Sequence, residues 1–114
     1  MLLWMTDEHI DKIRSTVEAA DHIPAEQKAE LLDRLSKVKP ALAEVAQTHQ
    51  EGAQSIAALV EASTQEATRK DKQPDVERRA LHRLKRSVEK FEASHPELVA
   101  SVTEYSAMLS ALGI

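Results

Sequence analysis

The chain has 114 residues, a formal net charge of −4, two glycines, one residue each of Trp, Tyr and Phe, and no cysteine. The absence of cysteine excludes disulfide bonds, thiolate metal sites and thiol nucleophiles. The shortage of glycine and aromatic residues disfavours hairpin turns and β-strands, while helix-forming residues are abundant. The composition therefore predicts a single all-α domain over residues 1–114.

The first predicted helix covers residues 7–20. Ile10, Ile13 and Val17 recur there at helical spacing. A break over residues 21–24 follows this helix. Pro24 suits the first turn of the next helix, where its missing N–H is not needed.

A long apolar stripe then follows with heptad spacing. It comprises Leu31, Leu35, Val38, Leu42, Val45, His49, Gly52, Ile56, Leu59 and Ser63. The stripe predicts one helix over 24–70, kinked near Pro40, and a turn over 71–75, where Pro74 disfavours helix for its predecessor.

A second stripe of the same kind occupies the C-terminal part. It comprises Leu81, Leu84, Val88, Phe91, His95, Leu98, Val102, Tyr105, Leu109 and Leu112. It predicts helices over 75–93 and 96–112. An alternative treats Pro40 and Pro96 as true breaks, since Ser94-His95-Pro96-Glu97 resembles a capping-box start. Four or five shorter helices then form a compact bundle.

The two stripes predict an antiparallel, coiled-coil-like hairpin of long helices with a short N-terminal helix, completed as a bundle by dimerisation. One register pairs residues whose numbers sum to 147, and its rival pairs those that sum to 140. The first places side by side Leu42 and Tyr105, Val38 and Leu109, Ile56 and Phe91, and Gly52 and His95.

The histidines and carboxylates show no catalytic or metal-binding pattern. His49 and His95 fall on the two stripes in neighbouring layers, and we interpret them as a polar layer that sets the register. No third ligand joins a histidine at metal-binding spacing, and no nucleophile motif or phosphate loop is present. The sequence predicts no enzyme, no catalytic residue, no metal and no cofactor.

The charge is unevenly distributed. Residues 69–90 contain nine Lys/Arg and four acids, a charge of +5, and the remainder contains six Lys/Arg and fifteen acids, a charge of −9. Candidate residues for an anion-binding face are Arg78, Arg79, Arg83, Arg86 and Lys90. However, Glu77 and Glu89 dilute this face and no aromatic residue is interleaved for base stacking. A solvated face, or one that pairs with the acidic part of a partner subunit, is favoured over nucleic-acid binding.

These features predict a cytoplasmic, non-enzymatic structural or interaction module that forms a homo-oligomer, with a dimer favoured. The alternative is an anion-binding helical protein that uses residues 78–90 to bind nucleic acid or an acidic surface. No apolar run reaches the ~20 residues of a membrane span.

The C-terminal segments Phe91-Glu92-Ala93-Ser94-His95-Pro96-Glu97-Leu98 and Leu109-Ser110-Ala111-Leu112-Gly113-Ile114 carry a family resemblance. Together with Leu31-Leu32-Asp33-Arg34-Leu35 and the loop 20–24, they resemble a family of short bacterial helical proteins, the domain-of-unknown-function family 4404. The resemblance covers about two thirds of the chain, and residues 47–73 are longer than is usual in the family. It implies a small bacterial helical protein and supplies no activity.

Overall fold

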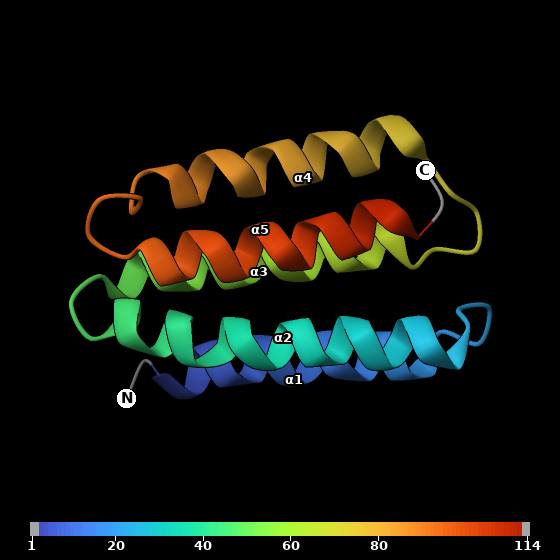
Figure 1. Cartoon of the computed structure of the whole chain (residues 1–114), viewed down its shortest axis with the longest axis horizontal. Helices are drawn as coiled ribbons and strands as arrows, with labels where there is room; N and C mark the ends of the chain where they lie inside the picture. Colours follow the sequence, from blue (N-terminus) through green and yellow to red (C-terminus); the bar gives the residue numbers. More distant parts are fainter. Residues whose placement is uncertain (1–2, 113–114) are drawn as a thin grey trace.

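The computed structural model describes residues 3–112, with side chains from Asp7 to Leu112. The helices of this part of the chain are α1 (Leu3–Ala19), α2 (Ala25–Ala46), α3 (Gln50–Ala67), α4 (Pro74–Glu89) and α5 (Pro96–Ala111) (Figure 1). The Cα radius of gyration is 13.2 Å, close to the ~13 Å of a compact domain of about 100 residues. The prediction of an all-α fold is confirmed.

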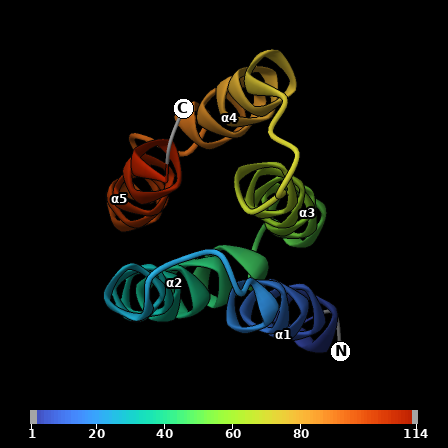
Figure 2. The ribbon, with the colours of Figure 1, turned by 90° about the vertical axis from the view of Figure 1, so that its right-hand side faces the viewer.

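Helices α2 to α5 form an up-and-down four-helix bundle. The connections 47–49 and 90–95 lie at one end of the molecule, and the connections 20–24 and 68–73 lie at the other (Figure 1). Seen along the bundle, α2 and α4 each lie beside α3 and α5, and α1 packs on the outer side of α2 and α3 (Figure 2). One chain therefore supplies all the helices of the bundle, and no second copy is needed to complete it.

The predicted continuous helix over 24–70 is wrong, because the chain turns back between α2 and α3. His49 has φ −134° and ψ 68°, outside the helical region. The dimensions of 38 × 24 × 18 Å also exclude the ~70 Å of an unbroken helix. Heptad spacing did not reveal this turn because the apolar residues on both sides of it face the same core, so the spacing continues across the break.

The prolines behave differently from each other. Pro40 lies within α2 and does not end it, whereas Pro96 begins α5. The compact alternative is therefore right at Pro96, and its other break occurs at 47–49 instead of at Pro40. The helix predicted over 75–93 is too long, since α4 ends at Glu89.

Two helix starts also differ from the predictions. The residue that caps α5 is His95 and not Ser94, and it makes no side-chain capping hydrogen bond. The predicted capping box is therefore wrong. Helix α1 begins at Leu3, ahead of the predicted start near residue 7.

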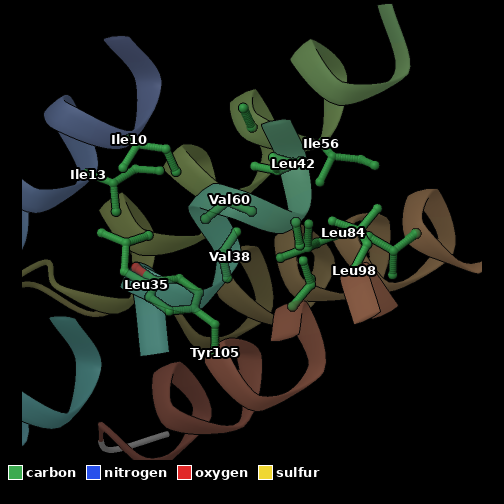
Figure 3. Close-up of a cluster of buried hydrophobic side chains, with 14 of the residues drawn as sticks. Ile10, Ile13, Leu35, Val38, Leu42, Ile56, Val60, Leu84, Leu98 and Tyr105 are labelled. Atoms are coloured by element: carbon green, nitrogen blue, oxygen red, sulfur yellow. The ribbon is translucent and has the colours of Figure 1, made fainter. Parts of the chain in front are cut away.

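The core lies between all five helices and is almost entirely aliphatic (Figure 3). Its largest member is Tyr105, which is fully buried. The Thr64 hydroxyl donates to the Val60 carbonyl oxygen at 2.8 Å, so the Tyr105 hydroxyl, 2.6 Å away, donates to the Thr64 oxygen. The only aromatic ring of the described core thus has its polar atom satisfied, as burial requires.

The register between α2 and α5 follows the rival sum of 140. The crevice between these helices is lined by Ser36 and Pro40 of α2 and by Glu104 and Ala100 of α5, two pairs whose numbers sum to 140. The register that sums to 147, which pairs Leu42 with Tyr105, is therefore wrong. The side chain nearest to a Cβ atom built on Gly52 is that of Phe91, with Cζ 2.9 Å away, and not that of His95 as predicted.

Candidate functional site

Helix α4 carries the candidate basic face, and the structure places this face in solvent. Its buried side consists of Glu77, Leu84 and Val88. The exposed side chains include all the cationic residues of the helix and the one that follows it, namely Arg78, Arg79, His82, Arg83, Lys85, Arg86 and Lys90. The predicted anion-binding residues therefore share one accessible helix.

The cations of this face take little part in holding the fold together. Arg78 pairs with Asp75 of the same helix at 2.8 Å, and within residues 3–112 the other Lys and Arg residues of the face form no ion pair. Cations elsewhere do pair with acids, as Lys70 does with Asp21 at 3.5 Å. The positive charge of α4 is thus left for solvent or a partner.

Three of these cations line one crevice between α3 and α4. The crevice has a volume of about 460 Å³ and is lined by Leu59, Arg83, Arg86, Ser87 and Lys90. Guanidinium groups form paired hydrogen bonds with carboxylates and phosphates, and an ammonium adds a point charge. The crevice is therefore chemically suited to an anion.

The two predicted histidines come together at the end of the bundle. The rings of His49 and His95 have centroids 6.1 Å apart, and Phe91 packs edge-on at 5.3 Å from His49 and 6.0 Å from His95. They precede α3 and α5 instead of sitting on a continuous seam. A hollow of about 620 Å³ beside them contains His49, Lys90 and Phe91.

The two histidines mark an internal repeat that the sequence analysis missed. Thr48-His49-Gln50-Glu51 and Ser94-His95-Pro96-Glu97 lie 46 residues apart. His95 has φ −138° and ψ 66°, close to the values of His49. Each histidine N–H donates to the carbonyl four residues earlier, at 2.8 Å for His49 and 2.7 Å for His95.

The same spacing of 46 relates apolar positions along both hairpins. It relates Leu35 to Leu81, Val38 to Leu84, Leu42 to Val88 and Ile56 to Val102. The hairpins α2–α3 and α4–α5 are thus two versions of one unit, and we call residues 46 apart equivalent positions. The recurring Ser/Thr-His-x-Glu motif was the signal in the sequence.

A groove separates α4 from α5, the most loosely packed neighbouring pair of the bundle. Its volume is about 370 Å³. Helix α4 contributes Leu81, His82, Lys85 and Val88, and α5 contributes short side chains that include Ser106 and Ala107. The groove thus has an apolar floor, a cationic edge on α4 and small residues on α5.

Glu77 differs from its predicted role as an exposed acid that dilutes the basic face. It is fully buried, and neither carboxylate oxygen has a hydrogen-bond partner among the described residues. Burial raises the pKa of the Glu77 carboxyl above its ordinary 4.5, Lys72 opposes this rise, and Glu66 adds to it. The acid belongs to the core and leaves the exposed face more strongly positive.

Within residues 3–112 no three histidine, cysteine or acidic side chains are grouped to hold a metal ion. No helix of this part of the chain is long and apolar enough to cross a membrane. Comparisons with models of known families, with curated proteins and with solved structures find no match to the chain. The family resemblance of the C-terminal segments stays a prediction.

Proposed function

We propose that the chain is a non-enzymatic interaction module that self-associates through helix packing centred on α4. The observation that supports this is the exposed basic face of α4, whose cations are almost all without intramolecular ion pairs. A surface that the fold does not need for its own stability is available for binding. The proposed location is the cytoplasm, which suits a chain without cysteine.

A second copy is the partner favoured by the distribution of charge. Residues 69–90 carry +5 and the remainder carries −9, so α4 of one copy complements the acidic surface of another. Val76 is the only large hydrophobic side chain exposed among the described residues. Association is therefore expected to be weak and dominated by charge, because exposed ion pairs are screened by salt.

Sedimentation velocity over micromolar concentrations tests this proposal. We expect an average mass that rises with concentration in low salt and returns to the monomer value in about 0.5 M salt, where the Debye length falls below ~5 Å. Arg79→Glu/Arg83→Glu/Arg86→Glu should abolish the rise. Lys12→Glu/Lys37→Glu, on exposed positions of α1 and α2, is the control and is compared with the double variant Arg79→Glu/Arg83→Glu, which reverses the same number of charges. A monomer at every concentration in low salt contradicts self-association.

Anion binding by α4 is the second candidate function. It is supported by the crevice in which Arg83, Arg86 and Lys90 converge beside Ser87. The probes are a single-stranded oligonucleotide and vesicles containing anionic lipid, each titrated at several salt concentrations. We expect the logarithm of affinity to fall linearly with the logarithm of salt concentration, and the triple arginine variant to lose binding. No binding of either probe in low salt excludes this candidate.

A further inference from the structure

The groove between α4 and α5 is equivalent to the groove that α1 fills. Helix α1 packs against α2 and α3, and its Ile10, Ile13 and Val17 are fully buried there. Among residues 3–112, no helix lies over the corresponding outer side of α4 and α5 (Figure 2). One unit of the repeat thus has a helix on its outer side, and the other lacks one.

The polar contacts of α1 show what a helix in such a groove requires. Asp7 lies 4.0 Å from Lys39 of α2, and His9 lies 2.6 Å from Glu61 of α3. The positions equivalent to these partners are Lys85 and Ala107, and both line the groove between α4 and α5. The α4–α5 groove therefore has Lys85 at the position of Lys39, which pairs with an acid of α1. It has Ala107, a small residue, at the position of Glu61, which pairs with a histidine of α1.

We infer that the groove between α4 and α5 is a docking site for an acidic amphipathic helix of another protein. Leu81 and Val88 offer an apolar floor to side chains with the spacing of Ile10, Ile13 and Val17. Ser106 and Ala107 are short enough to let a helix backbone approach. An acid on that helix meets Lys85 as Asp7 meets Lys39, and His82 adds a second polar contact on the α4 side.

The charge of the groove selects the occupant. The lining residues include Lys85 and His82 and no acid. A basic helix would be repelled, and an acidic helix would be attracted and oriented. Helix α1 of a second copy is not the occupant, because its apolar side chains are already buried in their own chain.

This inference rests on the chain's being an interaction module, although it does not require self-association. The test uses the full chain labelled with ¹⁵N and a synthetic peptide with the sequence of residues 3–20 and the change His9→Ala. The peptide carries the acid and the apolar spacing, and it lacks the histidine that favours the α2–α3 groove. We expect saturable shifts of amide signals at residues 81–88 and 102–110, with a Kd of tens to hundreds of micromolar because an isolated helix of this length is marginal in water.

Variants of both molecules identify the contact. Lys85→Glu should weaken binding several-fold, and Ala107→Trp should abolish it by filling the groove. Lys12→Glu, at an exposed position of α1 outside this groove, is the control and should bind within a factor of two. A peptide that also carries Asp7→Lys should bind the original chain more weakly and the Lys85→Glu chain more tightly.

Three results would overturn the inference. They are the absence of saturable shifts at millimolar peptide, shifts confined to α2 and α3, and an affinity that Lys85→Glu and Ala107→Trp leave unchanged. Sedimentation of the chain without peptide reports on self-association separately. If the peptide does not bind but the mass of the chain still rises with concentration, the helix-docking site is excluded and self-association is kept.

Discussion

The hairpins α2–α3 and α4–α5 share an apolar pattern and the backbone conformation of the histidine before the second helix, yet they have different surroundings. Helix α1 covers the outer side of the first, and Ala57 and Val60 of α3 are fully buried. The equivalent residues of α5 are Thr103, which is exposed, and Ser106, which is half-buried. The same helix position is thus apolar where a neighbouring helix covers it and polar where none does.

The difference extends to charge. Helix α2 has cations that pair with acids of α1 and of its own helix, as Lys39 and Lys37 do. The exposed cations of α4 mostly have no such partner in the described chain. The outer side of the first hairpin is thus used for contacts within the chain. The outer side of the second hairpin has few such contacts, which favours it as the binding surface. Equivalent positions supply matched pairs of substitutions that test this distinction.

The largest difference is expected between Val60→Asp and Ser106→Asp. Val60 is fully buried, so a carboxylate there loses its hydration without gaining a partner, at a cost of about 3 kcal/mol or more. Ser106→Asp should change the free energy of unfolding by less than about 0.5 kcal/mol. Urea denaturation measures both. Equal destabilisation would mean that the α4–α5 side is covered as fully as the side beneath α1.

Glu77 and its equivalent, Leu31, are both fully buried, and only the leucine suits that environment. Glu77→Leu should increase the free energy of unfolding at pH 7 by about 1–3 kcal/mol, because it removes a buried acid without partners. Since burial raises the pKa of Glu77, the folded state holds this proton more tightly than the unfolded state. The Glu77 contribution to stability therefore falls as pH rises above about 4.5, and the loss is complete above the raised pKa.

Unfolding curves from pH 4 to pH 8 measure this effect. The difference in stability between Glu77→Leu and the original chain should grow with pH. Glu89→Leu changes an exposed acid of the same helix and is the control, with a difference that stays nearly constant. A Glu77→Leu chain that is less stable at pH 7 would show that the carboxylate is satisfied in solution.

Gly52 is equivalent to Leu98, which is buried in the core. Gly52 instead meets the ring of Phe91, with only 2.9 Å between a built Cβ and Cζ. Gly52→Leu should therefore cost about 1–3 kcal/mol through overpacking. Thermal unfolding tests this, with Ala58→Leu at an exposed position of α3 as the control. The cost should shrink in a Phe91→Ala background, and an unchanged cost there would place the strain elsewhere.

The smallest effect is expected at Tyr105, whose equivalent, Leu59, lines the crevice beside Arg83. Tyr105→Phe removes the hydrogen bond to Thr64 and should cost about 1 kcal/mol. A double-mutant cycle with Thr64→Val isolates the pair, because the tyrosine hydroxyl has lost its acceptor in that background. Tyr105→Phe should then be neutral or stabilising. The same cost in both backgrounds would mean that the hydroxyl has another partner.

Local signals predicted much of the helical content. The spacing of Ile10, Ile13 and Val17 located α1, and the prolines at 24, 74 and 96 stand just before or at the first residue of α2, α4 and α5. These residues act through the geometry of their own helix turn, so their effect does not depend on distant contacts. The break at 47–49 has no proline and no glycine, and it was missed.

The candidate site was predicted in part. Arg78, Arg79, Arg83, Arg86 and Lys90 were identified from charge and helical phase, because a helix with one apolar side exposes the other. The burial of Glu77 was not predicted, although it stands at the position equivalent to Leu31. The groove between α4 and α5 also went unrecognised, since a groove belongs to two helices and depends on what covers them.

The sequence by itself determined that the chain is helical, which side of each helix is apolar, and where positive charge gathers. These properties follow from side-chain chemistry repeated at 3.6-residue spacing. Only the tertiary structure decided that the first stripe folds back on itself, that α2 meets α5 in the register summing to 140, and that α1 fills one of two equivalent grooves. Heptad spacing is the same for a continuous helix and for a tight helical hairpin, so burial against other parts of the chain makes the choice.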